Sequence, residues 1–387
     1  MDLIKRDKEC IVHTYDRYDM VVDKGNGSLI YDDEGREYID FVQGLGASIL
    51  GHCHPTINSI VKSEIDKITH VSGLYYSKPR ILLAEKLCSL TGMGKVSFVN
   101  SGSEANEAAI KLVRKYGNER QCGRNKILAM VDGFHGRTMG SVSVTWGQRY
   151  KKGFDPLLPG IDFVEFNNAD DLRMKCTTDV IAVIFEPVQG SANKIRPLEN
   201  EFVRALNFMQ EHGVLLIADE VQCGIGRTGK LFGYQNFDLQ PDVITVAKGL
   251  GNGYPIGAAM IKKEYDTFEI SSHGTTFGGN PWVCNAALGV LQTIENDKLL
   301  KNSMEIGEYL YDRLMERYWV RKVSGLGLMR SAELIFDAEN FVKLCRKDGL
   351  ILNKFPGNSV KFSPAINVSK DLIDDAIKIM EEVANKC

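Results

Sequence analysis

The chain has 387 residues and a formal net charge of −3, with 44% hydrophobic and 25% charged residues. This length allows a large core and two structural units, and the near-balanced charge excludes a general attraction to nucleic acid or to an anionic membrane. No apolar stretch is long enough to cross a bilayer, and the charged residues 1–9 lack the apolar core of a signal peptide. Nine cysteines without paired spacing favour reduced thiols, so we expect a cytoplasmic protein with no nucleic-acid or membrane partner.

The first predicted elements are short. Residues 31–40 have the pattern strand, turn, strand, because an Asp/Gly cluster separates two short strand-like runs. Helical spacing of apolar residues begins at about residue 56 and again at residue 81. The stretch 51–55 holds two histidines two positions apart, but no second cluster of metal ligands accompanies them, so we expect a structural turn there and no metal site.

The middle of the chain alternates strands and helices. Near-continuous apolar runs separated by helices predict a mostly parallel sheet covered by helices on both faces. After Pro281 the pattern is helical to about residue 318, short strands and turns follow, and a last helix covers 371–385. The predicted strands are 96–99, 127–131, 180–185, 214–218 and 243–247, and the helices between them include 104–116 and 199–212.

This order of elements predicts an α/β fold in two parts. The large domain covers residues 51–280. A smaller α+β domain is built from both chain ends, with the N-terminal segment 1–50 joining residues 281–387. No internal repeat or low-complexity linker interrupts the chain.

Lys248 ends the apolar run 243–247, and glycines follow it at once. The run predicts a buried strand, which places the lysine at the carboxyl edge of the sheet, where open α/β folds bind ligands. One interpretation is a solvated strand end. The other is a partly desolvated amine that forms a Schiff base.

A possible phosphate site follows the strand at 96–99. Small residues turn the chain and a helix begins, with Ser101 and Glu104 spaced as in a capping box. Free backbone N–H groups, the helix dipole and two hydroxyl groups would suit a phosphate. Plain helix capping is the alternative.

Two more strand ends carry polar side chains. Phe134, His135 and Arg137 follow the strand 127–131, where they could stack on a planar ligand and hold a carboxylate, or form an ordinary turn with a solvated arginine. Asp219 ends a buried strand. Because an unpaired buried carboxylate is costly, we expect a cationic partner, either a protein Arg or Lys or a protonated ring nitrogen.

These strand ends would meet at one edge of a parallel sheet. Together they present an amine, an acid, a ring-stacking cluster and a phosphate cradle. A planar aromatic cofactor with an aldehyde, a basic nitrogen and a phosphate satisfies all four features. Pyridoxal phosphate is that molecule, and we expect it to be bound covalently to Lys248.

The sequence resembles the class III pyridoxal-phosphate aminotransferases, and among them the acetylornithine and ornithine aminotransferases. The resemblance runs nearly end to end and implies the fold-type I architecture of that family. The motifs that carry it are Gly51–Pro55, Asn100–Glu107, Phe134–Thr138, Asp219–Gln222, Lys248, His273–Pro281 and Val323–Leu328.

The resemblance implies that Lys248 and Asp219 are catalytic, since the lysine carries the cofactor and moves a proton while the aspartate pairs with the pyridinium nitrogen. It places Phe134 on the cofactor ring and Gln222 near the phenolic oxygen. Thr276 would reach the phosphate of the neighbouring subunit, which implies a homodimer with shared active sites. The implied cofactor-binding residues are Ser101, Gly102, Ser103, Phe134, His135, Asp219, Glu220, Val221, Gln222, Lys248 and Thr276.

The substrate side departs from the family pattern. Ser191 stands where the family usually has glutamate, and Lys361 where it has an arginine that clamps a substrate carboxylate. In the ornithine branch those two residues pair with each other, and lysine keeps the charge of arginine but loses its bidentate fork. Gly73 and Ser331 are further departures. The implied substrate residues are Tyr15, Arg137, Glu186, Ser191, Thr275 and Lys361.

We therefore expect a transaminase that moves an amino group from a terminal-amine donor, such as N-acetylornithine or an ornithine-like amine, to 2-oxoglutarate by a ping-pong Schiff-base mechanism. Three alternatives within the cofactor class remain: a transaminase for another diamine or specialised amine, an aminomutase, and a decarboxylase. A non-catalytic protein that binds pyridoxal phosphate is the alternative from a different class.

Overall fold

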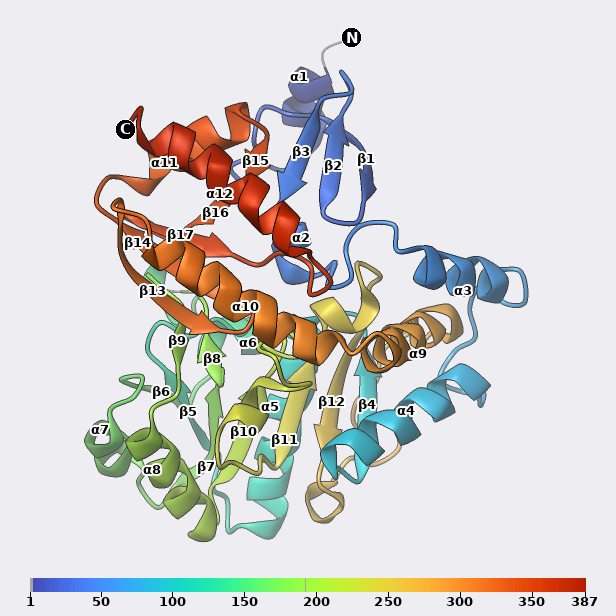
Figure 1. Cartoon of the computed structure of the whole chain (residues 1–387). Helices are drawn as coiled ribbons and strands as arrows, with labels where there is room; N and C mark the ends of the chain where they lie inside the picture. Colours follow the sequence, from blue (N-terminus) through green and yellow to red (C-terminus); the bar gives the residue numbers. More distant parts are fainter. Residues whose placement is uncertain (1–2, 192) are drawn as a thin grey trace.

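The computed structural model describes residues 3–191 and 193–387. A seven-stranded sheet with the order β4-β12-β11-β10-β7-β5-β6 forms its centre (Figure 1). The strands are β4 (Lys95–Val99), β5 (Lys126–Met130), β6 (Ile161–Val164), β7 (Val180–Phe185), β10 (Leu215–Asp219), β11 (Val243–Val246) and β12 (Gly257–Ile261). The helices are α1 (Leu3–Cys10), α2 (Gln43–Gly46), α3 (Pro55–Ile65), α4 (Lys78–Thr91), α5 (Gly102–Arg120), α6 (Met139–Val144), α7 (Ala169–Lys175), α8 (Asn200–Glu211), α9 (Pro281–Asn296), α10 (Leu299–Met315), α11 (Ala338–Lys347) and α12 (Lys370–Ala384).

Helices cover both faces of this sheet because its strands are apolar on both sides. Along β5, Ile127 packs in one buried cluster with residues of α5, whereas its neighbour Leu128 packs in another with residues of α7 and α8. Alternation of this kind is what a strand buried on both faces requires. The predicted α/β layering is confirmed.

The sheet is mostly parallel, as predicted. The strands β11, β10, β7, β5 and β6 pair in parallel, while β12 runs antiparallel to both of its neighbours, β11 and β4. All five predicted strands are present, but β6 and β12 were not predicted. Small residues make up most of β12. The strand β6 has only four residues, Ile-Asp-Phe-Val, and one of them is a polar aspartate. Neither strand therefore has a long run of large apolar residues.

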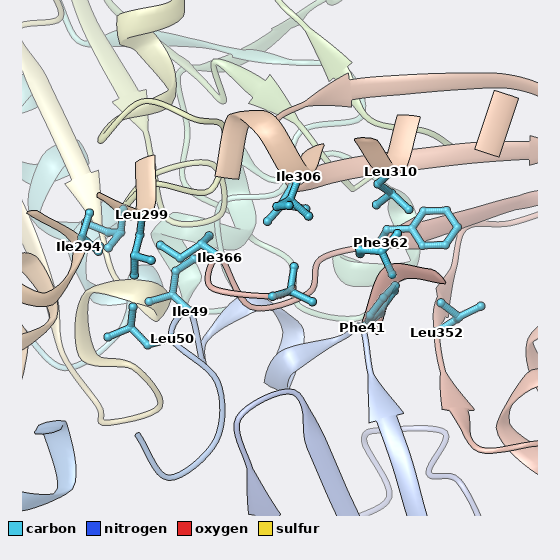
Figure 2. Packing of buried hydrophobic residues seen from close by; sticks show 14 of the residues in the cluster. Phe41, Ile49, Leu50, Ile294, Leu299, Ile306, Leu310, Leu352, Phe362 and Ile366 are labelled. Atoms are coloured by element: carbon cyan, nitrogen blue, oxygen red, sulfur yellow. The ribbon is translucent and has the colours of Figure 1, made fainter. Parts of the chain in front are cut away.

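The two chain ends form one structure beside the large sheet. Leu350 of β15 pairs in parallel with Ile39 of β3, so a C-terminal strand completes the N-terminal sheet. Figure 2 shows Phe41 and Ile49 from the N-terminal part packed near Phe362 and Ile366 from the C-terminal part. The strands are β1 (Val22–Asn26), β2 (Leu29–Asp32), β3 (Glu37–Asp40) and β15 (Leu350–Ile351) in one sheet, and β13 (Val320–Leu326), β14 (Met329–Leu334), β16 (Asn353–Lys354) and β17 (Ser359–Phe362) in another.

A short hairpin of β8 (Val188–Gln189) and β9 (Arg196–Pro197) follows β7. The domain boundaries near residues 50 and 280 stay a prediction. Within the described residues, no helix has the length and apolar character needed to cross a membrane.

Candidate active site

A pocket of about 300 Å³ lies at the carboxyl edge of the large sheet. The loops that follow β4, β5, β10 and β11 each contribute to its wall, because these strands share one direction. The structure therefore brings together residues that are far apart in the sequence. The predicted site residues that line this pocket are Ser101, Gly102, Ser103, Phe134, His135, Glu186, Asp219, Val221, Gln222 and Lys248.

Lys248 begins a short 3-10 turn directly after β11, with a backbone φ of 42°. A left-handed conformation is unfavourable for lysine and is found mostly where surrounding structure enforces it. No other described residue forms a hydrogen bond or ion pair with its amine. Burial lowers the pKa of Lys248, opposed by the nearby carboxylates of Asp219 and Glu186. A lowered pKa favours the neutral amine, which is the nucleophilic form.

Asp219 is 2% exposed, and three groups satisfy its carboxylate. His135 Nδ1 lies 2.7 Å from Oδ2, the amide nitrogen of Asn106 donates to the same oxygen at 2.8 Å, and the backbone N–H of Val221 donates to Oδ1 at 3.0 Å. Among the described residues, no Lys or Arg nitrogen lies within 4 Å of it. The partner within the described part of the protein is thus an imidazole, and Oδ1 accepts one hydrogen bond there, from Val221.

Asn106 is the main site residue that the sequence did not reveal. It is 1% exposed, its nitrogen also donates to the His135 carbonyl at 2.7 Å, and its oxygen accepts from the Thr245 hydroxyl at 2.7 Å. A polar side chain on the apolar face of the helix after Ser103 was the available signal. The side chain ties α5 to the ends of β5, β10 and β11.

The start of α5 fits an anion. Ser101 caps the helix by accepting from the N–H of Glu104 at 3.2 Å, as predicted, but the Glu104 carboxylate bonds the N–H of Asn100 at 2.6 Å instead of completing a capping box with Ser101. The N–H groups of Gly102 and Ser103 have no partner among the described residues. A Cβ on Gly102 would come within 2.7 Å of the Val221 side chain, so the cradle requires glycine. Two free N–H groups at a helix start suit a phosphate.

Phe134 and Glu186 form the wall next to Lys248. The Phe134 N–H donates to Glu186 Oε1 at 3.0 Å, which fixes the loop after β5 against the end of β7. Burial raises the pKa of the Glu186 carboxyl. Arg137 is exposed and lies over the Tyr150 ring at 4.3 Å, outside the residues that line the pocket.

Lys361 lies behind the pocket wall. Its amine donates to the carbonyl of Gly190 at 2.9 Å and to Gln222 Oε1 at 2.9 Å. Burial, and after it the charge of Lys248, lowers the pKa of Lys361 to about 7. Ser191 is next to this contact but lines a neighbouring pocket of about 330 Å³, which it shares with Phe134.

Four further predicted site residues also lie outside the pocket of this chain. Tyr15 is 66% exposed on the N-terminal segment, and Thr276 is exposed on the loop before α9. Thr275 accepts a hydrogen bond from the Asn100 side chain at 2.9 Å, one step outside the pocket. Glu220 is not among the residues that line the pocket, and its carboxylate accepts from the N–H groups of Gly233 and Tyr234 at 2.6 and 2.7 Å. Burial raises the pKa of Glu220 to about 7.

Comparison with known proteins decides the family. The model of the family "Aminotransferase class-III" matches residues 11–384. This chain belongs to the class-III aminotransferases. It is a pyridoxal-phosphate-dependent aminotransferase, as the family assignment implies.

Relatives of this class-III aminotransferase match it over nearly the whole chain. The acetylornithine aminotransferase of Archaeoglobus fulgidus is 40% identical over 382 residues, which cover 98% of this chain and 100% of the relative. The acetylornithine aminotransferase of Clostridium acetobutylicum is 41% identical, and the match covers 97% of this chain and 99% of the relative. The ornithine aminotransferase of Toxoplasma gondii has a TM-score of 0.94 at 25% identity, with 99% and 95% covered. A second structure of the ornithine aminotransferase from Toxoplasma gondii reports partial occupancy of pyridoxal phosphate at the active site.

Asn106→Leu tests the network around Asp219. The substitution leaves the buried carboxylate one hydrogen bond short, so we expect a loss of about 1–3 kcal/mol in the free energy of unfolding, measured by guanidinium titration at fixed protein concentration. Thr245→Val is the matched control, because it removes only the bond to the Asn106 oxygen and should cost about 1 kcal/mol. Equal stability of the two variants would contradict this role for Asn106.

Proposed function

We propose that this aminotransferase moves the amino group of N-acetylornithine, or of a related terminal amine with a distal carboxylate, to 2-oxoglutarate. The observation that carries the chemistry is the amine of Lys248, which has no partner among the described residues and lies in the same pocket as Asp219. The names of the relatives at 40% and 41% identity support the choice of donor.

The chain's own groups have distinct tasks in this reaction. Bound pyridoxal phosphate supplies an electron sink for the carbon that carries the amine. Lys248 holds the cofactor covalently and moves a proton at that carbon, because a neutral amine both attacks carbonyls and accepts protons. Asp219 keeps the ring nitrogen protonated, and its Oδ1 atom has the capacity to accept that bond.

The remaining cofactor contacts follow from the pocket wall. The free N–H groups of Gly102 and Ser103 hold the phosphate, and Phe134 lies against the ring. Gln222 donates to the phenolic oxygen, since its amide nitrogen has no other partner among the described residues. His135 acts through Asp219 and holds that carboxylate in place.

We propose a homodimer in which Thr276 reaches the phosphate in the partner's pocket. Thr276 is exposed and remote from its own pocket, and large apolar side chains around it and in the 74–76 segment are exposed. Leu74 is 88%, Tyr76 96% and Ile270 100% exposed, and extensive apolar exposure of this kind is typical of an interface. The nine unpaired cysteines support a cytoplasmic location.

Arg137 and Lys361 are the residues that we propose to bind the substrate carboxylates. Arg137 is exposed beside the Phe134 ring and is available to the distal carboxylate of the donor, and we propose Tyr15 and Thr275 as further donor contacts. Lys361 attracts the carboxylate of the acceptor. Ser191 supplies no negative charge, and no carboxylate among residues 3–191 and 193–387 pairs with this lysine, so we propose that it stays unmasked in both half-reactions.

A second candidate is a transaminase for a different diamine or specialised amine. The observation that favours it is the presence of Ser191 and Lys361. These two residues replace the acid–arginine pair of the ornithine branch, on which the standard choice of substrates depends.

An amine-donor panel tests the proposed reaction. Purified protein is given N-acetylornithine, ornithine and an uncharged-end diamine, each with 2-oxoglutarate or pyruvate, and products are identified by mass. We expect the highest kcat/KM for N-acetylornithine with 2-oxoglutarate, since that donor offers a terminal amine and a carboxylate for Arg137 without a second free amine. Equal turnover of the diamine would instead support the second candidate, and Lys248→Ala is the inactive control.

Reduction with borohydride tests the covalent anchor. The pure protein should absorb visible light through its bound cofactor, and reduction should fix the cofactor to the peptide that contains Lys248, as read by mass spectrometry. Lys361 is the internal comparison, because burial lowers its pKa as well. Recovery of the label on Lys361, or a protein without bound cofactor, would overturn the assignment of Lys248.

Lys361→Arg tests the acceptor site. Arginine offers a bidentate, permanently charged donor, so we expect kcat/KM for 2-oxoglutarate to rise by about tenfold to a hundredfold, which corresponds to about 1.5–3 kcal/mol. Since the pKa of Lys361 is about 7, its charge is present below pH 7 and is lost as the pH rises. Use of 2-oxoglutarate by the natural protein should therefore fall through pH 7, whereas the arginine variant should show no such fall.

Lys354→Arg is the matched control for this change, because Lys354 is an exposed lysine on the neighbouring strand that pairs with Glu339. An unchanged kcat/KM in Lys361→Arg would show that Lys361 does not contact the acceptor.

A further inference from the structure

Three departures from the family pattern meet at one place. Lys361 on β17 is the direct cross-strand neighbour of Ser331 on β14. Lys361 donates to the carbonyl of Gly190, and the Ser331 hydroxyl accepts from the N–H of Ile195 at 2.9 Å. The turn that carries Ser191 is therefore fastened at both ends to the same small sheet.

The contact with Lys361 determines which way the Gln222 amide faces. An amide oxygen and nitrogen have nearly the same shape, so packing alone does not distinguish the two orientations. The ammonium group of Lys361 can only donate hydrogen bonds, so the Gln222 atom that faces it must be the amide oxygen. This agrees with the 2.9 Å hydrogen bond from Lys361 to Oε1. The amide nitrogen is then directed elsewhere, and it has no hydrogen-bond partner within residues 3–191 and 193–387.

Gly190 fixes the same amide from a second side. A Cβ at this position would collide with the Gln222 oxygen and with the Met329 methyl group, so the amide lies directly against the backbone. Gln222 also lines the pocket. Its amide is thus held by a donor and a close backbone contact, while the nitrogen stays available to a ligand.

We propose that Lys361 is a positioning residue that turns the amide nitrogen of Gln222 into the pocket, where it donates a hydrogen bond to the anionic oxygen on the ring of the bound cofactor. This inference rests on the proposed cofactor site. It gives Lys361 a task in both half-reactions, in addition to attracting the acceptor.

The charges around Lys361 agree with this arrangement. Lys248 and Arg227 face it with like charge and Glu186 with opposite charge, while no carboxylate oxygen of the described residues lies within 4 Å of its amine. Both of its hydrogen bonds also survive loss of a proton, because a neutral amine keeps two N–H groups. The orientation of Gln222 is therefore retained across neutral pH.

A spectroscopic double-mutant cycle on the holoenzyme tests the proposal. The readout is the pKa of the visible absorption band of the bound cofactor, measured by pH titration without substrate. Loss of a donor to the anionic oxygen raises that pKa, so Lys361→Met and Gln222→Leu should each raise it by about 0.5–1 unit. The double variant should match Gln222→Leu alone, because Lys361 acts through Gln222.

Two conservative variants complete the design. Lys361→Arg keeps the donors and should retain the natural pKa of the band. Ser331→Ala removes the other fastening of the turn without touching Gln222, and it should also leave the band unchanged. If Lys361→Met fails to fold or to hold the cofactor, Lys361→Gln keeps an N–H donor group and takes its place, with an expected pKa between those of the natural protein and Gln222→Leu.

Two results would overturn the inference. An unchanged band in Lys361→Met would show that the amide needs no positioning, and a full shift that persists in the Gln222→Leu background would show a direct charge effect. Failure of the proposed function would give a different result: the natural protein itself would lack the visible absorption band of the cofactor.

Discussion

The buried carboxylate of Asp219 is the constraint on which the site depends. A charge at the end of a buried strand must be satisfied, and the groups that satisfy it come from the loop after β5, from α5 and from the turn after β10. The network reaches β11 through Thr245, three residues before Lys248. Holding the acid in place therefore also holds the surrounding strand ends in register, and the amine and the acid occupy one pocket.

The sequence predicted the layers and the strand ends because long apolar runs and abrupt polar residues are local signals. Lys248, Asp219 and Phe134 each end or follow such a run. The sequence could not predict the contacts of Asn106 or the Lys361–Gln222 contact. Each contact depends on which helix face or strand packs against the residue in the folded protein, and local patterns do not give this. The hydrogen bonds of Glu220 to the backbone of Gly233 and Tyr234 were unpredictable for a related reason: adjacent residues after a strand end point in different directions, and the motif does not say which one faces the pocket.

The pocket residues and the departures from the family pattern lie in different parts of the structure. The pocket is built on strand ends of the large sheet, where packing fixes each backbone position. Ser191, Ser331 and Lys361 lie where the β8–β9 hairpin meets the small sheet. Changes at this junction can alter which molecules react while the strand ends that perform the reaction stay the same.

The pairing of β3 with β15 has a consequence for synthesis of the protein. Ile39 leaves the ribosome long before its strand partner Leu350, because the whole large sheet is encoded between them. Until then the edge of the N-terminal sheet stays open, and an open edge is a template for wrong pairing. During this interval the first strands depend on burial by other segments, and the sheet is complete only when β15 has been made and has paired with β3.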